Sequence, residues 1–297
     1  MKADLHIHSA YSNDGEIAIS DIISMCLENG IDTFAITDHN CVGGSREARD
    51  LITSHPDLRF IPGIEIDCNY HGTDLHVLGY QVGLDNGDFD ALERSNNQKH
   101  MDAVPRMIHN LAQLGIEVDQ EELMIKSGGN PPSAELFAEL LLEKPQQADN
   151  PKLAPYLPGG RRSDMPLINF YLDYFAQGKP AYVEIKHMDY REAIELVKSN
   201  GGIPVVAHPG LNLKGKEALA KELLDHGATG LEVFNNYHSD EQVAYFGDLC
   251  RRRNALMTCG SDFHGKNKPL ISIGHYSQTE PYSEYLDQSL ARLIRDY

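Results

Sequence analysis

Short apolar runs alternate with amphipathic stretches along most of this chain, and this alternation constrains the fold more than any other feature of the sequence. Such alternation is typical of βα units built around a parallel sheet. The runs expected to form strands are residues 3–8, 33–38, 59–67, 74–82, 202–209, 230–235 and 255–262. The main helices expected between them are residues 19–28, 190–199, 217–224 and 240–252. The sequence therefore predicts an α/β barrel, for which 297 residues are sufficient.

Residues from about 98 to 181 interrupt this alternation. A long helical pattern from Asn97 to Leu114 leads into further helical stretches and into a loop rich in proline, glycine and polar residues at 145–164. We therefore expect three segments: a first part of the barrel at 1–97, an inserted helical cap domain at 98–181 and a second part of the barrel at 182–297. Such an insertion can cover a site on the barrel.

The charge balance argues against polyanionic partners. The chain has 26 Lys and Arg residues against 44 Asp and Glu residues, which gives a formal charge of -18. A surface of this charge repels nucleic acid polymers and anionic membranes. Carboxylates gathered at one site are stable as anions only when they are paired or bind metal, so the acidic excess and the 14 histidines together suggest bound cations.

The cysteines and the amino terminus indicate a cytoplasmic protein. The five cysteines are odd in number and never form a CxxC pair, so neither a disulfide framework nor a structural zinc knuckle is expected. Buried thiols in a reducing compartment are the simpler interpretation. The chain begins without a basic segment followed by an apolar one, and no run of about 18 apolar residues follows. The sequence leaves the oligomeric state open.

Two histidines one residue apart, His6 and His8, lie in the first expected strand. Alternate side chains of an extended strand point the same way, so both imidazoles can bind one metal ion. Functional groups of a parallel α/β barrel converge at its carboxyl-terminal mouth. The histidines and carboxylates that lie within expected strands, at their ends or just beyond are His6, His8, Asp14, His39, Glu65, His76, His208, Asp262 and His264. We therefore expect these nine side chains to form one cluster.

Nine candidate ligands are enough for two or three ions, because a four-coordinate site takes three or four protein ligands and carboxylates can bridge. Mixed nitrogen and oxygen donors suit Zn, Mn or Fe better than Mg or Ca. Metal ions a few ångströms apart activate a bridging water, so hydrolysis is the expected chemistry. The remaining histidines in helical stretches, His100, His109 and His226, are expected to be surface or packing residues.

The sequence also favours phosphorus over carbon as the centre of attack. Arginine is a bidentate ligand for phosphate. The candidate basic and neutral hydrogen-bonding groups in or next to the insertion and in late loops are Arg161, Arg162, Lys179, Lys186 and His238.

Four motifs, DLHIHS, TDHN, GIE and GSDFH, with AHPG and a GxEVF strand between the last two, resemble the PHP (polymerase and histidinol phosphatase) family of phosphoesterases. The resemblance covers residues 1 to about 95 and 182 to 275. It is to the stand-alone, trinuclear branch with an inserted helical domain. This resemblance implies a distorted, TIM-like (β/α)7 barrel with metals at its carboxyl-terminal mouth.

The resemblance further implies three divalent ions, Mn, Zn or Fe, and a division of the ligands among them. Positions that match His6, His8, Glu65 and Asp262 hold the first ion, those that match Asp14, His39 and His264 the second, and those that match Glu65, His76 and His208 the third. A hydroxide shared by the first two ions would then attack phosphorus. Asp38, beside His39, would orient a ligand or carry a proton.

The same branch hydrolyses small phosphate esters, which implies a nucleotide, a nucleoside bisphosphate or a sugar phosphate as the substrate. A basic residue of the insertion and a histidine after the GxEVF strand contact phosphate in this branch. The nearest matches here are Arg161 or Arg162, Lys179 and His238. Where relatives often read GRPH before a helix of the insertion, this chain reads GNPPSAELFAELL, so the substrate of any one relative is not carried over.

Three other interpretations remain open from the sequence. A cyclic phosphodiesterase would use the same nucleophile on a small cyclic phosphate. An amidohydrolase or deaminase also begins with HxH on a barrel strand, although it usually pairs this motif with a bridging lysine or spaced histidines. A non-catalytic scaffold would normally lack some ligands, and none of the nine positions is missing.

Overall fold

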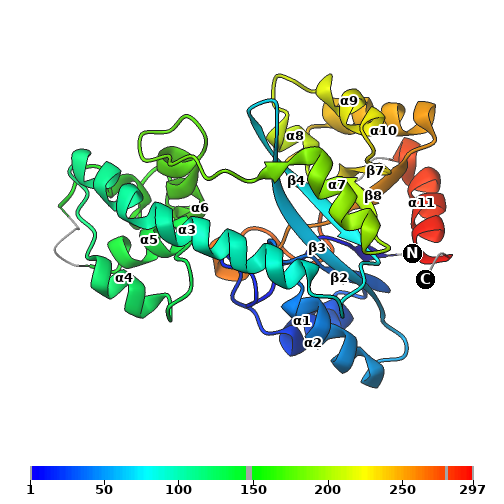
Figure 1. The fold of residues 1–297 in the computed structure, drawn as a ribbon, viewed down its shortest axis with the longest axis horizontal. Helices are drawn as coiled ribbons and strands as arrows, with labels where there is room; N and C mark the ends of the chain where they lie inside the picture. Colours follow the sequence, from blue (N-terminus) through cyan, green and yellow to red (C-terminus); the bar gives the residue numbers. More distant parts are fainter. Residues whose placement is uncertain (1, 145–148, 278–279, 296–297) are drawn as a thin grey trace.

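The computed structural model describes residues 2–144, 149–277 and 280–295. Over these residues a sheet of eight strands curls into a nearly closed barrel, seen in the right half of Figure 1. The strands are β1 (Ala3–Asp4), β2 (Thr33–Ile36), β3 (Arg59–Tyr70), β4 (Thr73–Tyr80), β5 (Met188–Asp189), β6 (Ile203–Val206), β7 (Gly230–Phe234) and β8 (Leu256–Cys259). They follow the order β1-β2-β3-β4-β6-β7-β8, and β5 pairs with β3.

The barrel closes where the segment after β8 lies against β1 and the residues that follow it. The backbone N–H of Leu5 donates to the carbonyl of Cys259 over 3.0 Å, and the N–H of Asp262 donates to the carbonyl of His6 over 2.9 Å. Ile7 also forms a parallel bridge with Phe263. The predicted distorted barrel is therefore confirmed.

One part of the parallel-sheet prediction is wrong, because β4 runs antiparallel to both β3 and β6. Only His71 and Gly72 separate β3 from β4, and both have positive φ values, of 51° and 78°. A connection of two residues can form only a hairpin, whereas a parallel crossover needs a dozen or more residues. The hairpin extends β3 beyond the neighbouring strands.

Helices cover the outside of the barrel: α1 (Ile19–Glu28), α2 (Gly43–Leu51), α7 (Tyr190–Ser199), α8 (Pro209–Asn212), α9 (Leu219–Asp225), α10 (Asp240–Arg253) and α11 (Ser283–Arg295). In α1, Ile19, Ile22, Ile23 and Cys26 are buried, and this spacing forms one apolar stripe along a helix.

Capping boxes at Asp189 and Ser239 begin α7 and α10. α1 and α7 have the predicted bounds. Short 3-10 turns are η1 (Ile52–Ser54), η5 (Gly265–Asn267) and η6 (Glu280–Tyr282).

The long helix α3 (Asp88–Gln113) carries the chain out of the barrel to a second group of helices (Figure 1). Its first turns pack Phe89 and Leu92 into the barrel core, and its later turns pack Val104 and Leu111 into a separate core. The helix begins well before the predicted start at Asn97, so residue 98 lies inside α3. We call residues 98–181 the insert.

The insert continues with α4 (Gln120–Lys126), α5 (Ala134–Leu142), η3 (Ala154–Tyr156), α6 (Pro166–Phe170) and the π-helical turn η4 (Tyr171–Phe175). Phe137, Leu141 and Phe170 are buried in its own apolar core. The first residues of the predicted loop at 145–164, residues 145–148, lie outside the described residues.

All five cysteines are buried free thiols, as the sequence predicts. Among the described helices, none is both long and apolar enough to span a membrane.

Candidate metal centre

The nine predicted ligands lie together at the carboxyl-terminal mouth of the barrel. Most of them directly follow strands, as His39 follows β2 and His208 follows β6, while Glu65 and His76 project from the β3–β4 hairpin. Three groups have ligand atoms within 4.8 Å of one another: His6, His8, Glu65 and Asp262; His8, Asp14, His39 and His264; and Glu65, His76 and His208. Residues distant in the sequence thus form one continuous cluster.

Glu65 lies at the centre of this cluster, with its two carboxylate oxygens facing different groups. Oε2 lies 3.2 Å from Nε2 of His6, 3.2 Å from Nε2 of His8 and 3.4 Å from Nε2 of His39. Oε1 lies 2.9 Å from Nδ1 of His76 and 3.1 Å from Nε2 of His208. The side chain is fully buried. One carboxylate can therefore serve two sets of imidazoles.

The donor atoms fit bound metal ions better than they fit one another. Oε2 of Glu65 is buried and has no hydrogen-bond partner among the described residues. Nε2 of His6 lies 3.1 Å from Nε2 of His8. At most one of these two nitrogens can carry a proton that points toward the other. A buried polar atom without a partner costs about 1–3 kcal/mol. Imidazole nitrogens and carboxylate oxygens that converge without their own partners are the donor set of a transition-metal site.

Charge within the cluster shifts the pKa values of its members strongly. Burial alone would raise the pKa of Glu65, but the surrounding imidazoles hold it well below its usual range. Burial would lower the pKa of His6, but Glu65, Glu232 and Asp262 hold it well above its usual range. The cluster therefore carries anionic carboxylates that require cations nearby.

A second layer of side chains orients the imidazoles. Nδ1 of His6 lies 3.0 Å from Oε1 of Glu232, whose Oε2 accepts a 2.7 Å hydrogen bond from the backbone N–H of His208. Nδ1 of His39 lies 2.8 Å from Oδ1 of Asp67. Such partners fix the ring and the tautomer that faces a metal. Sequence reasoning missed both carboxylates, although Glu232 stands alone in an apolar strand and Asp67 follows Glu65 at strand spacing.

Asp38 lies behind the cluster. Its carboxylate accepts hydrogen bonds from the backbone N–H and the hydroxyl of Ser9, over 2.6 and 2.8 Å. Burial raises the pKa of Asp38 to about 6. Asp67 rather than Asp38 contacts the His39 ring, and the role of Asp38 as an orienting group or proton carrier stays a prediction.

The cluster opens into a cavity of about 550 Å³ between the barrel and the insert. The insert contributes apolar and aromatic groups, among them Ile168, Tyr171 and Phe175. None of the predicted phosphate contacts Arg161, Arg162, Lys179, Lys186 and His238 is among the described residues that line this cavity.

Each of these five side chains either forms hydrogen bonds outside the cavity or is exposed on the surface. Nε and Nη2 of Arg162 donate to Asp173 over 3.0 and 3.1 Å, inside the insert. The ring of buried His238 lies between the carbonyl of Val233, 2.8 Å from Nδ1, and the N–H of Gly210, 2.9 Å from Nε2. Arg161, Lys179 and Lys186 are exposed.

Lys268 contributes a cation to this cavity that sequence reasoning missed. Its Nζ lies 2.6 Å from Oδ2 of Asp262, which also accepts a 2.6 Å hydrogen bond from the hydroxyl of Tyr237. Burial would lower the pKa of Lys268, but Asp262 and Tyr237 hold it well above its usual range. Asp262 itself has a φ of 57°, a strained conformation for a residue other than glycine.

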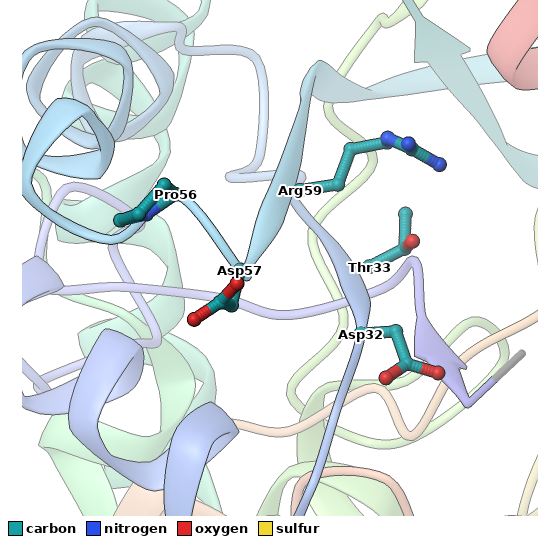
Figure 2. A pocket seen from close by; sticks show the side chains of 5 residues that line it. All are labelled: Asp32, Thr33, Pro56, Asp57 and Arg59. Carbon is teal, nitrogen blue, oxygen red and sulfur yellow. The ribbon is translucent and has the colours of Figure 1, made fainter.

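Figure 2 shows another cavity, of about 540 Å³, lined by Asp32, Thr33, Pro56, Asp57 and Arg59. Thr33 and Arg59 are the first residues of β2 and β3, so this cavity lies at the end of the barrel opposite the cluster. Its lining has no histidine, and we assign it no chemistry.

Comparisons with known proteins agree with this geometry. The chain is 25% identical to the 3',5'-nucleoside bisphosphate phosphatase of Chromobacterium violaceum, over 98% of both chains. It is 27% identical to the 5'-3' exoribonuclease Rnm of Salmonella typhimurium, over 91% of this chain and 87% of the relative. A solved amidohydrolase structure from Chromobacterium violaceum shares the fold, with a TM-score of 0.79 and 24% identity over 99% of this chain and 97% of that chain. Residues 4–229 match the PHP domain family. With this match over most of its length, the chain belongs to the PHP domain family.

Proposed function

We propose that this protein is a metal-dependent hydrolase of phosphoric ester bonds, and that it acts on a small phosphate monoester. The observation that carries the proposal is the buried Glu65 carboxylate, whose unpartnered Oε2 faces three imidazole nitrogens while its Oε1 faces two more. The name of the Chromobacterium violaceum relative, a phosphatase similar over nearly its whole length, supports a phosphate ester as the substrate.

We propose three divalent ions, of Mn, Zn or Fe, held by the three groups of side chains given above. Such ions, when bound, supply an activated water and neutralise charge on a phosphoryl group. The protein's own residues hold this arrangement in place: Glu232 and Asp67 fix imidazole tautomers, while Lys268 and Tyr237 fix the Asp262 carboxylate.

Lys268 is also the group that we propose for binding the phosphoryl oxygens. Among the described residues that line the cavity, it is the only Lys or Arg. Its Nζ lies at the edge of the ligand cluster, so an ester phosphate there would meet both the cation and the ligand groups. A charge-assisted hydrogen bond of this kind is about twice as strong as a neutral one.

The insert is proposed to act as a cap domain, with 1–97 and 182–297 forming the two parts of the barrel. The insert gives the cavity apolar and aromatic lining groups, which suit the leaving group of a small ester, such as the nucleoside of a nucleotide or bisphosphate. A cavity of about 550 Å³ is in the range of small-molecule sites, which favours a small substrate over a polymer.

The test is metal analysis of the purified chain together with a substrate screen. The screen compares phosphomonoesters, nucleoside bisphosphates, sugar phosphates, small cyclic phosphates, short RNA and an amide substrate. We expect release of phosphate from monoesters, its loss on chelation and its return with Mn, Zn or Fe. Preferred cleavage of cyclic phosphates or RNA would overturn the substrate class, and activity insensitive to chelators would overturn the mechanism.

A further inference from the structure

A second set of metal-ligating side chains lies where the insert joins the barrel. It consists of Asp67 on β3, His100 on α3 and His187 just before β5. Both imidazoles line the cavity, although neither belongs to the nine ligands described above. The sequence predicted His100 to be a surface or packing residue, and the structure places this half-buried side chain in the cavity wall.

We propose that Asp67, His100 and His187 form a fourth cation site, for a divalent transition-metal ion, which fastens the insert to the barrel. One ligand atom from each residue lies within 4.8 Å of the other two. Two imidazoles and one carboxylate with a further open position are a common ligand set for zinc and related ions.

The backbone explains how the three residues meet. In the parallel pairing of β3 with β5, Cys68 is opposite Met188, so the preceding residues Asp67 and His187 are level with each other. α3 leaves the barrel beside them and brings His100 to the same place. The site therefore lies on both chain segments that connect the insert to the barrel.

The spacing of the donor atoms fits an ion between them better than direct hydrogen bonds. Within the described residues, no hydrogen bond or ion pair joins Asp67 to His100 or His187. Asp67 instead contacts His39, Asn40 and His76. Zinc ligands lie about 2.0–2.2 Å from the metal, so the donor atoms of a tetrahedral site lie about 3.3–3.6 Å apart. Donors within 4.8 Å of one another would have to approach by at most about 1.5 Å to bind one ion.

His187 supplies an independent observation. Its Nδ1 is buried and has no hydrogen-bond partner among the described residues. The His187 ring lies 5.9 Å from that of His100 at an angle of 53°, so the two rings are not stacked. Burial lowers the pKa of both imidazoles, which favours the neutral form that binds metal. A buried nitrogen without a hydrogen-bond partner needs a physical explanation, and an ion bound by this group of residues supplies one.

The experiment is a count of bound ions in the full chain reconstituted with Zn²⁺. His100→Gln and His187→Gln are compared with wild type and with His109→Gln, an exposed histidine on the same helix. We expect each of the first two variants to bind one ion fewer per chain, the double variant to lose no more than either single one, and His109→Gln to bind the wild-type number. An unchanged count in both single variants would overturn the proposal.

A crystal of the zinc-loaded wild-type protein gives a second readout that needs no variant. We expect an anomalous peak between Asp67, His100 and His187, separate from peaks around Glu65. Peaks around Glu65 with none at the proposed site would overturn the fourth site and leave the proposed function intact. A peak at the proposed site with none around Glu65 would support the fourth site and overturn the proposed metal centre.

Discussion

Lys268 and Asp262 form a largely buried ion pair of 2.6 Å at the edge of the ligand cluster. The pair uses Oδ2 of the carboxylate, while Oδ1 faces His6 and His8 at 3.3 and 3.2 Å. One carboxylate thus joins a cation of the cavity wall to two imidazoles of the cluster. A substrate phosphate bound to Lys268, as proposed, would therefore lie next to a carboxylate that also faces the imidazoles of the cluster.

Replacing Lys268 by methionine should lower kcat/KM for a phosphomonoester by roughly 10- to 100-fold, because a hydrogen bond to a charged group contributes about 1.5–3 kcal/mol. Metal affinity should also fall, because Lys268 helps to fix the Asp262 carboxylate, so kcat/KM is measured at saturating metal. Steady-state kinetics and metal analysis check both parts. Lys266→Met is the control, because Lys266 pairs with Glu16 and Glu139 outside the cluster. An unchanged kcat/KM in Lys268→Met would exclude its proposed role.

Replacing Glu65 by glutamine should reduce bound metal and turnover together. The amide keeps the size of the side chain but removes the negative charge that faces five imidazoles. We expect the loss of at least two ions per chain and of more than about 100-fold in kcat. Glu121→Gln, an exposed position on α4, is the matched control. Full metal content with unchanged kcat would contradict the central role of Glu65.

Glu232→Gln tests the second layer. The variant keeps a similar shape but weakens the partner of His6 Nδ1, and loss of such partners typically lowers metal affinity by about 10- to 100-fold. Titration of the metal-free protein with Zn²⁺ measures the affinity, and far-ultraviolet circular dichroism controls for folding. Wild-type affinity would show that Glu232 serves only to hold the backbone of His208.

Arg162→Ala should destabilise the insert without a direct effect on catalysis. The change removes the hydrogen bonds to Asp173, a carboxylate that also accepts from the hydroxyl of Tyr156. We expect a loss of about 1 kcal/mol in the free energy of unfolding. Lys179→Ala, at an exposed turn, should change neither stability nor kcat/KM by a measurable amount. A large fall in kcat/KM for Lys179→Ala would restore the role predicted from the sequence.

Glu135 should make the stability of the metal-free protein depend on pH. Burial, with the nearby Asp14 carboxylate, raises the pKa of Glu135 to about 7 from an ordinary value of 4.5. Between these two values the folded state binds more protons than the unfolded state, so the free energy of unfolding falls as the pH rises. The fall attributable to this group is about 3 kcal/mol. Urea unfolding at pH 5 and pH 8 should show it in wild type, and Glu135→Gln should reduce it.

The clustering of the nine candidate ligands could be predicted because it depends on local rules. His6 and His8 point the same way because side chains alternate along an extended strand, and His39 and Asp262 lie at the mouth because they follow barrel strands. The same local periodicity gave α1 and α7 their bounds. These features need only the sequence of one element and the general architecture of a barrel.

Local rules of this kind did not predict three features: the direction of β4, the start of α3 and the presence of Lys268 in the cavity. The helical pattern was predicted to begin only at Asn97, whereas α3 begins at Asp88, where Phe89 and Leu92 pack into the barrel core. Sequence reasoning named Arg162 and missed Lys268, because only the structure shows that Arg162 pairs with Asp173 inside the insert and Lys268 with Asp262 at the cavity.

The sequence by itself determined the barrel class, the bounds of α1 and α7, the approximate places of the strands, and nine of the side chains that meet at the mouth. Only the tertiary structure decided which carboxylate each imidazole faces, and that His100 and His187 lie beside Asp67. The physical reason is that side-chain direction follows from the backbone of one element, whereas the distance between two donor atoms depends on where elements far apart in the chain finally pack.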